Sequence, residues 1–410
     1  MAITIYPKSE HIKISMIFSS FLGLFPWEFM FVKNPLLQKT YAAYSKLIFS
    51  YTLFLIGTAY IELFFIFQRG NVRMEELSHN LTVTLIETIT VIRQLIMKFS
   101  PGFKHILRHI INSEEKVMKS KDQKLIKIYL DCATDTRNKT LLYMAILLAI
   151  SVLYAIRPIL RGSYIQKVGN DTVLLKTLPL SIWMPFDTQT YYARAYLWQM
   201  FFCLVGGSFV AYTDIFMFNL ISYPSGQLKM LHHQLSNFDL YKQKNKIKHQ
   251  LQDDNAASVT FIWFIKEHQE IIKYIDYFND AMSMLMVFDF LQSSLQIASI
   301  FTQVNDLTLK MFIFVAVCFI GMIIRLVLYY YYANELIILS IGLGDAIWKS
   351  NWYEQPKAVK FMIQIFILRT QKPLKFFIGP FAVMSLESFI SILKATYSYV
   401  TLFMRRHINN

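Results

Sequence analysis

Residues 379–405 read GPFAVMSLESFISILKATYSYVTLFMR, a stretch long enough to cross a bilayer as one helix at about 1.5 Å per residue. Its polar side chains recur at steps of three and four, which places them on one face of that helix. This polar stripe comprises Glu387, Ser391, Lys394, Ser398, Thr401 and Arg405. Polar groups facing lipid are costly, so the stripe predicts the wall of a conduction path or a polar seam between packed helices.

The composition of the whole chain predicts an integral membrane protein. Of its 410 residues, 55% are hydrophobic and 17% are charged, and the mean hydropathy is +0.37. Soluble proteins carry about 25% charged residues. The net charge of +14 is typical of basic cytosolic loops and does not by itself indicate nucleic-acid binding. The first ten residues are polar, so we expect no cleavable signal peptide.

Seven apolar runs are candidate membrane spans. They cover residues 47–67, 77–97, 141–160, 196–221, 282–301, 311–332 and 379–405. The second run is the least hydrophobic, so we expect its helix to be shielded from lipid or to line a wet cavity. Gly206 and Gly207 in the fourth run predict close helix approach or a bend. The sequence Pro224-Ser225-Gly226 predicts the end of that helix.

The distribution of Lys and Arg predicts the orientation of the chain. With the N-terminus in the cytosol, 28 of these residues fall in inner segments and 10 in outer segments. The N-terminus is therefore expected inside and the C-terminus outside, opposite to a G-protein-coupled receptor. Asn170, in an Asn-Asp-Thr sequon, falls in the predicted long outer loop and is a glycosylation candidate.

No motif in the sequence indicates catalysis. The chain has no phosphate-binding glycine loop, no His-Glu-x-x-His and no Gly-x-Ser-x-Gly, and its three cysteines are far apart. We therefore expect no enzyme activity, no catalytic residue, no cofactor and no metal site. Glu87, Asp289 and Arg325 lie inside predicted spans, where an ionisable residue is either functional or paired with a neighbouring helix.

The C-terminal motif resembles the terminal signature of insect odorant receptors. It consists of Ser385-Leu386-Glu387-Ser388-Phe389, then Ser391-Ile392-Leu393-Lys394, then Tyr397-Ser398-Tyr399. The chain length, the inside N-terminus, the seven spans and the long loop between spans four and five agree with that family. The chain is similar to a tuning subunit, because the coreceptor of the family has a longer loop there and a more apolar C-terminus.

This resemblance implies an all-α membrane protein whose last helix is split into cytosolic and pore-lining parts. It implies a subunit of a ligand-gated, non-selective cation channel in the plasma membrane of sensory neurons, in contact with membrane lipid. The partners implied are the olfactory coreceptor (Orco) in a heterotetramer and a small volatile ligand, with no nucleic acid. The implied layout is a cytosolic segment 1–46, helices 47–221, anchor helices 222–281, helices 282–332, anchor helices 333–378, a pore helix 379–405 and an extracellular tail 406–410.

The family resemblance also implies positions for a gate and a ligand pocket. Leu402 is the expected apolar gate, flanked by Ser398, Thr401 and Arg405. Lys394 and Arg405 are unusual in a cation path, which favours a pore shared with coreceptor subunits. The pocket is expected in the outer half of the bundle. Its candidate residues are Thr84, Thr88, Ser151, Tyr154, Phe202, Phe209, Phe312, Val315 and Phe319.

Two other functions stay open from the sequence. A related gustatory receptor would form a homomeric channel and conduct without a coreceptor. A metabotropic receptor or a transporter would have the inverted topology, with its C-terminus in the cytosol.

Overall fold

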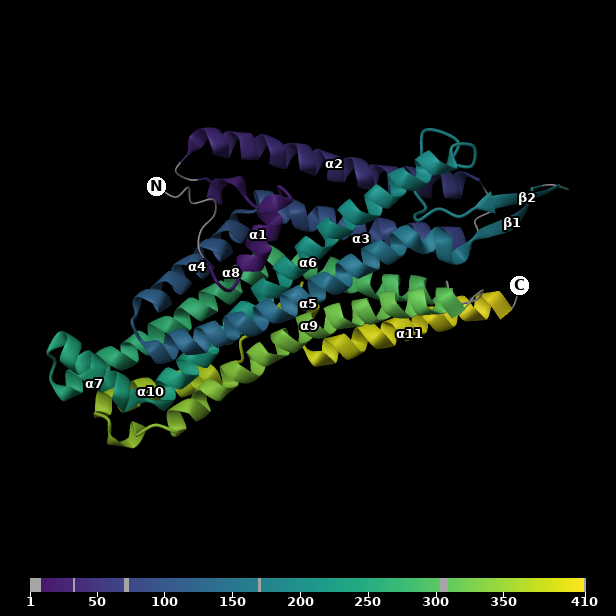
Figure 1. The fold of residues 1–410 in the computed structure, drawn as a ribbon. Helices are drawn as coiled ribbons and strands as arrows, with labels where there is room; N and C mark the ends of the chain where they lie inside the picture. The colour runs from purple at the N-terminus through teal and green to yellow at the C-terminus, as the bar shows by residue number, and fades with distance from the viewer. Residues whose placement is uncertain (1–8, 32–33, 70–73, 169–170, 303–308, 409–410) are drawn as a thin grey trace.

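The computed structural model describes residues 9–31, 34–69, 74–168, 171–302 and 309–408 (Figure 1). The helices run as α1 (Lys13–Phe21), α2 (Pro35–Gln68), α3 (Met74–Phe99), α4 (Pro101–Lys119), α5 (Gln123–Arg161), α6 (Tyr192–Ser236), α7 (Phe238–His249), α8 (Asp253–Thr302), α9 (Leu309–Trp348), α10 (Lys357–Thr370) and α11 (Leu386–Ile408). Strands β1 (Ser163–Val168) and β2 (Asp171–Lys176) pair antiparallel, as do β3 (Phe377–Ile378) and β4 (Ala382–Val383).

Local sequence accounts for where several helices begin. Asn34 and Ser100 each precede a proline, and their side chains accept hydrogen bonds from Leu37 N and Phe103 N. Asp122 caps α5 by accepting from the backbone N–H groups of the next turn. These side chains satisfy N–H groups that have no partner within the helix, while a proline at the first position loses nothing.

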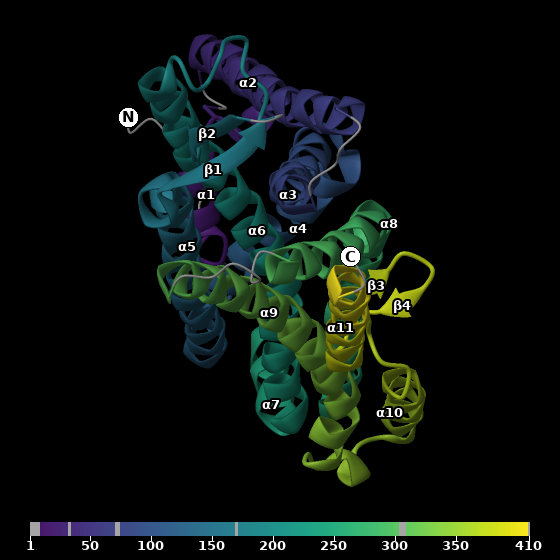
Figure 2. The ribbon, with the colours of Figure 1, turned by 90° about the vertical axis from the view of Figure 1, so that its right-hand side faces the viewer.

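Six helices in the described ranges are long and apolar enough to cross a membrane, namely α2, α3, α5, α6, α8 and α9. Helix α11 is the seventh predicted span, and it lies on the side of the bundle opposite α2 (Figures 1 and 2). In α3, 61% of the most apolar window is buried, against 22% in α5. The prediction that this least hydrophobic span is shielded by its neighbours is therefore confirmed.

Helix α6 does not end at Pro224-Ser225-Gly226, and that prediction was wrong. The helix continues to Ser236 because another group replaces the hydrogen bond that Pro224 cannot make. The carbonyl of Leu220, four residues before Pro224, accepts a hydrogen bond of 2.7 Å from the Tyr274 hydroxyl on α8. The expected boundary at residue 222 therefore falls inside the continuous helix α6. The expected boundaries at residues 282 and 333 likewise fall inside the continuous helices α8 and α9.

The segments expected to form an anchor gather at one end of the molecule, where α7 and α10 lie beside the ends of α6, α8 and α9 (Figure 1). Aromatic rings form the core of this end. Phe261 on α8 contacts Phe238 at 6.1 Å and Phe366 on α10 at 5.8 Å between ring centroids. The Phe261–Phe366 pair is edge-to-face and the Phe238–Phe261 pair is tilted, and aromatic contacts at such distances add to the stability gained from burial.

A tight hairpin separates α10 from α11. Gly379, between β3 and β4, has a positive φ of 53°, and its N–H donates to Ser283 O at 2.8 Å. A Cβ at this position would lie 2.5 Å from Val287 Cγ2, so only glycine fits here without displacing α8. The hairpin divides the last helical region into two parts, as the family resemblance implied.

Four charged side chains from four helices meet in the middle of the bundle. Arg93 on α3 pairs with both Asp214 on α6 and Asp289 on α8, at 2.6 Å to the latter. Arg325 on α9 approaches Asp289 at 2.8 Å and Asp214 at 3.4 Å. All four residues are at most 8% exposed. We call them the charge network.

Hydroxyl groups complete the charge network. Tyr143 on α5 donates to Asp214 Oδ2 at 2.9 Å, and Tyr329 on α9 donates to the Asp214 backbone carbonyl at 2.8 Å. Two cations balance two anions, so no net charge is buried, and five helices are tied at one level. Structural pairing, one of the two alternatives for Asp289 and Arg325, is therefore what the fold uses them for.

Removing Arg93 is expected to destabilise the protein strongly. In Arg93→Met, two carboxylates share one guanidinium in a buried site, which typically costs about 3–5 kcal/mol. Thermal unfolding of the detergent-solubilised protein, followed by size-exclusion chromatography, measures the loss. Arg69→Met is the control, because Arg69 pairs with Glu62 and Glu76 at the surface and is 57% exposed, so about 1 kcal/mol or less is expected. Equal melting temperatures for the two variants would contradict the role of the network.

The N-terminal segment is fastened to α6 through Asn219. The carbonyl of Asn219 lies 2.8 Å from His11 Nε2, and its side-chain amide bonds Ser15 and Thr140. A carbonyl only accepts, so Nε2 of His11 carries the proton. Burial lowers the pKa of His11 from 6.5 to about 4, despite the opposing effect of this hydrogen bond.

Mild acid is therefore expected to weaken the attachment of the N-terminal segment. In the unfolded chain His11 is protonated below pH 6.5, whereas in the folded chain it is protonated only below about pH 4. Stability is thus complete above pH 6.5 and falls as the pH drops, by about 2 kcal/mol at pH 5. His11→Gln keeps a donor without the titration, so its melting temperature should fall less between pH 7 and pH 5. An identical pH dependence in both proteins would exclude His11 as the cause.

Candidate ligand cavity

A small cavity of about 120 Å³ lies between α3, α5 and α6. We call it the inner cavity. Its lining residues are Thr82, Val83, Ile86, Glu87, Leu147, Ile150, Ser151, Tyr154, Leu180, Phe202, Cys203, Gly207 and Val210. Most of these side chains are apolar, and a few polar groups converge among them, which is the usual composition of a small-molecule site.

The two glycines of α6 determine how closely the cavity walls approach. A Cβ on Gly207 would lie 2.6 Å from Ser151 Cβ on α5, and a Cβ on Gly206 would lie 2.8 Å from Glu87 Oε1 on α3. Both distances are shorter than real Cβ atoms tolerate, so α6 can approach both neighbours only because these positions lack a side chain. The predicted close helix approach at this pair is confirmed.

Three of the predicted pocket residues line the inner cavity, namely Ser151, Tyr154 and Phe202. Thr84 and Thr88 do not. Thr84 bonds the Asn80 backbone carbonyl at 2.9 Å, and the hydroxyl of Thr88 lies 2.9 Å from the Tyr60 hydroxyl on α2. The face of α3 that lines the cavity carries Val83 and Glu87. Each of these residues directly precedes one of the two threonines, and one residue along a helix turns the side chain toward a different face.

The remaining candidates lie outside the lining. Phe209 is 1% exposed and belongs to the core, and Phe319 packs against that core from α9. Val315 belongs to a small buried cluster on α9. Phe312 is 55% exposed on the outer surface of the bundle. Helix α9 meets the cavity wall instead through Phe314, whose ring packs edge-on against Tyr154 at 5.1 Å.

A second cavity of about 80 Å³ adjoins the first. The two share apolar wall residues, among them Ile86, Ile150 and Tyr154. The second cavity also reaches the charge network. Its polar lining consists of Thr90, Arg93, Tyr143, Asp214, Gln292, Gln296 and Arg325. The apolar cavity and the charged centre of the bundle are therefore neighbours, separated by a single layer of side chains.

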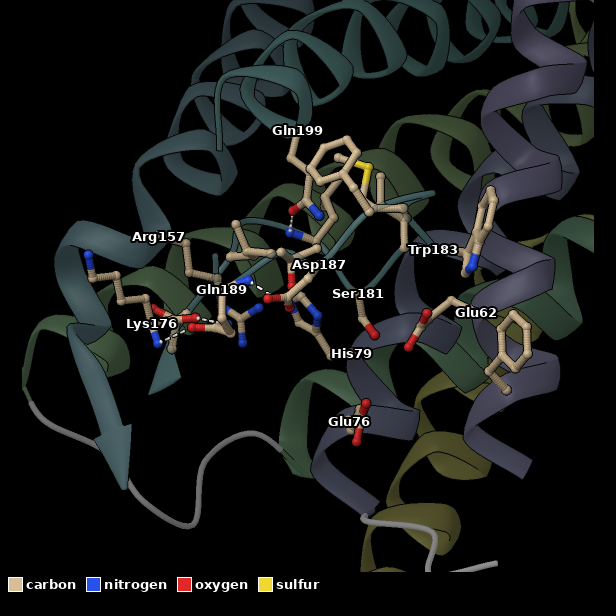
Figure 3. A pocket seen from close by; sticks show the side chains of 18 of the residues that line it. Glu62, Glu76, His79, Arg157, Lys176, Ser181, Trp183, Asp187, Gln189 and Gln199 are labelled. Atoms are coloured by element: carbon tan, nitrogen blue, oxygen red, sulfur yellow. Dashed lines mark hydrogen bonds between the residues drawn. The ribbon is translucent and has the colours of Figure 1, made fainter. Parts of the chain in front are cut away.

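An outer vestibule of about 560 Å³ lies on the other side of the inner cavity (Figure 3). Figure 3 shows Glu62, Glu76, His79 and Arg157 among the polar side chains around it. Leu180, in the loop before α6, lines both the vestibule and the inner cavity. The outer vestibule, with several charged residues in its lining, and the mostly apolar inner cavity are therefore neighbours.

Hydrogen bonds from three helices hold the loop that carries Leu180. Gln199 on α6 accepts from Leu180 N at 2.9 Å, the side chain of Asn80 on α3 donates to Ser181 O at 2.7 Å, and Trp183 N donates to Thr58 O on α2 at 3.1 Å. These bonds hold the loop in the position in which its Leu180 lines the inner cavity.

The polar stripe of α11 is not a seam inside the chain. Glu387, Ser391, Lys394 and Ser398 are exposed, while Ile392 and Thr396 on the opposite face are buried against α8 and α9. The stripe thus faces away from its own bundle, and Thr401 is half-buried. Leu402 and Arg405 lie on α11 where the side chains are outside the described part, and Asn170 lies outside the described residues altogether.

The comparison with known proteins identifies the family. Residues 73–397 match the sequence model described as 7tm Odorant receptor, which is most of the chain. The chain belongs to this odorant receptor family. The resemblance seen in the C-terminal motif is thereby confirmed, and the family is one of receptors and not of enzymes. Among the described residues, no group of His, Cys, Asp or Glu is arranged to hold a metal ion.

A solved structure confirms the fold. The chain superposes on the insect olfactory receptor OR5 of Machilis hrabei, solved in complex with eugenol, with a TM-score of 0.73. The match covers 96% of this chain and 97% of that one, at 15% identity. The all-α membrane fold expected from the sequence is therefore the fold of this receptor.

Several proteins similar to this chain in sequence are also odorant receptors. Odorant receptor 67c of Drosophila melanogaster is 23% identical over 64% of this chain and 64% of its own length. Odorant receptor 10 of Aedes albopictus is 30% identical over 44% of this chain and 46% of its own length. The match to the Drosophila odorant receptor coreceptor is weaker, at 21% identity over 33% of this chain and 29% of the coreceptor. The chain thus spans less than two thirds of the length of each relative.

A methyl group at Gly207 is expected to disturb the inner cavity wall. Gly207→Ala forces α5 and α6 apart at Ser151, and such overpacking typically costs about 1–3 kcal/mol. Removing the opposing side chain in Gly207→Ala/Ser151→Gly should recover part of this loss, which a double-mutant cycle on melting temperature measures. Gly57→Ala on α2 is the control, because nothing lies within 4 Å of its added Cβ. Strictly additive effects would mean that the two positions do not clash.

Proposed function

We propose that the chain is the odorant-binding, tuning subunit of a ligand-gated, non-selective cation channel. Its partner is the olfactory coreceptor (Orco), with which it assembles as a heterotetramer in the plasma membrane of sensory neurons. The observation that carries the proposal is the inner cavity, a mostly apolar hollow between α3, α5 and α6 of an odorant receptor fold.

The dimensions and lining of the inner cavity suit a volatile organic molecule. A cavity of about 120 Å³ is close in size to an engineered apolar cavity of about 150 Å³ that binds benzene, so a molecule with one small ring fits once the side chains adjust. Apolar walls such as Ile86, Leu147 and Phe202 supply affinity by removing apolar ligand surface from water, at about 25 cal/mol per Å². Ser151 and Tyr154 add polar contacts that orient the ligand.

The charge network supplies a route from the cavity to the pore helix. It borders the second cavity and joins α3, α5 and α6 to α8 and α9. Helix α11 packs against α8 and α9, with Phe389 6.4 Å from Tyr330 between ring centroids. A ligand that moves α3 or α5 therefore shifts a rigid polar centre, and this shift tilts α11. Such transmission through one bistable packed element is an ordinary mode of coupling.

We place the pore along α11. Its polar stripe is exposed on the single chain, as a wall completed by neighbouring subunits would be. In this proposal Leu402 is the apolar gate, which closes by dewetting and opens when the helix tilts. Lys394 is also exposed. Four copies of a lysine around one axis would repel cations, so the heteromer, in which coreceptor subunits supply part of the lining, is favoured over a homomeric gustatory-type channel.

Co-expression with the coreceptor tests the proposal. Cells expressing both chains are expected to give odorant-evoked cation currents that cells expressing this chain alone lack. Leu402→Ala should widen the constriction and raise the current without odorant several-fold, measured by whole-cell recording at matched surface expression. Leu386→Ala, an apolar truncation at the other end of α11, is the control and should leave the resting current unchanged.

Three results would count against this function. Silence of surface-expressed complexes across a broad panel of volatiles would reject it. Full currents without the coreceptor would favour a homomeric channel. Labelling of the C-terminus from the cytosolic side would point to the inverted topology of a metabotropic receptor or transporter.

A further inference from the structure

Glu87 differs from the four residues of the charge network because no described residue forms an ion pair with it or bonds its Oε2 atom. It is 4% exposed and lines the inner cavity from α3. Its Oε2 atom is buried without a hydrogen bond, and no ion pair among the described residues includes this carboxyl group. The nearest arginine on the same helix, Arg93, pairs instead with two aspartates.

Packing holds the Glu87 carboxyl group at the cavity wall. Oε1 lies against the backbone of Gly206, at 2.8 Å from where a Cβ would stand. The absence of a side chain at Gly206 is thus what makes room for the carboxyl group between α3 and α6. Buried polar groups in native proteins are nearly always hydrogen-bonded, so an orphan beside a cavity indicates a partner that enters that cavity.

We propose that Glu87 is the residue that selects the chemical class of ligand, namely a small apolar molecule with one neutral O–H or N–H donor. Unpaired in an apolar cavity, the Glu87 carboxyl group is neutral. Its carbonyl oxygen accepts a hydrogen bond, so the complement of this oxygen in the ligand is a donor. Alcohols, phenols and N–H heteroaromatics satisfy this condition, whereas ethers and hydrocarbons do not. This inference rests on the proposed odorant-binding function and adds to it the chemistry of the ligand.

The surroundings of Glu87 favour a neutral donor over an ammonium ion. Val83, Ile86 and Phe202 line the adjoining wall and cannot accept hydrogen bonds, and the Ser151 hydroxyl already donates to Leu147 O at 2.9 Å. A primary ammonium brings three strongly hydrated N–H groups to a site whose lining is mostly apolar. A single O–H or N–H leaves nothing unsatisfied.

Isomeric odorants test the inference at constant size and composition. Para-ethylphenol and para-methylanisole are isomers, as are phenylethanol and benzyl methyl ether, and only the first of each pair has an O–H donor. In complexes with the coreceptor, the donor isomer is expected to activate at a roughly 2- to 10-fold lower concentration, the range typical of a hydrogen bond between neutral groups. Concentration–response curves of the evoked current give the ratio.

Substitution of Glu87 should remove this preference without unfolding the receptor. Glu87→Met has a similar volume and leaves no orphan polar group, and it should bring the ratio of the two isomers to about one. Glu87→Gln keeps one acceptor oxygen and should give an intermediate ratio. Ile86→Val is the matched control, because it alters the same cavity without changing a polar group and should shift both isomers alike. Surface labelling confirms equal expression.

The outcomes separate this inference from the proposed function. Currents that the ethers evoke as well as the donor isomers, or a preference that survives Glu87→Met, would overturn the inference alone. Stronger activation by phenethylamine than by phenylethanol would overturn the choice of a neutral donor. Silence of surface-expressed complexes toward all four isomers and the broad volatile panel would overturn the proposed function, and the inference with it.

Discussion

The cost of leaving a charge unpaired in a membrane interior governs the arrangement of this receptor. Arg93, Asp214, Asp289 and Arg325 each come from a different helix, and each is nearly inaccessible to water. None could occupy the interior alone at an acceptable free energy, so the helices must meet at the level where all four charges are neutralised together. Hydrophobic packing in lipid specifies helix register only weakly, and this ionic contact specifies it strongly.

The ligand cavity and the charge network lie at successive levels of α3. Glu87 faces the inner cavity, and Arg93 less than two turns further along faces the centre of the bundle. The two positions differ in their partners. Arg93 pairs with Asp214 and Asp289 and is therefore structural, whereas Glu87 has an unpaired carboxyl oxygen beside a cavity that a ligand can enter. In the mechanism proposed here, recognition takes place next to the most rigid part of the fold, so a small displacement by the ligand reaches α8 and α9.

Sequence patterns predicted the helices of this protein better than the residues of its cavity. Length, apolar runs and polar stripes were sufficient for the spans, for the shielding of α3 and for the close approach at Gly206 and Gly207. The cavity depends on helical phase, and an error of one residue turns a side chain by about 100°. Thr84 and Thr88 were expected to line the ligand pocket. In the structure their neighbours on α3, Val83 and Glu87, line the inner cavity. Pro224 was expected to end α6, because a proline signals a helix break until a distant donor such as Tyr274 replaces the lost hydrogen bond.

The sequence by itself determined the class of protein, its helical content, its family and the polar stripe on its last helix. These follow from composition and from short-range periodicity, which each segment carries within itself. The tertiary structure alone decided which buried ionisable groups are paired, which one is left open, and which faces of α3, α5 and α6 enclose a cavity. Each of those properties depends on side chains brought together from different helices, in the charge network from 36 to 196 residues apart in the chain. Distances of an ångström between such side chains separate a salt bridge from an orphan carboxyl group, and no local pattern encodes them.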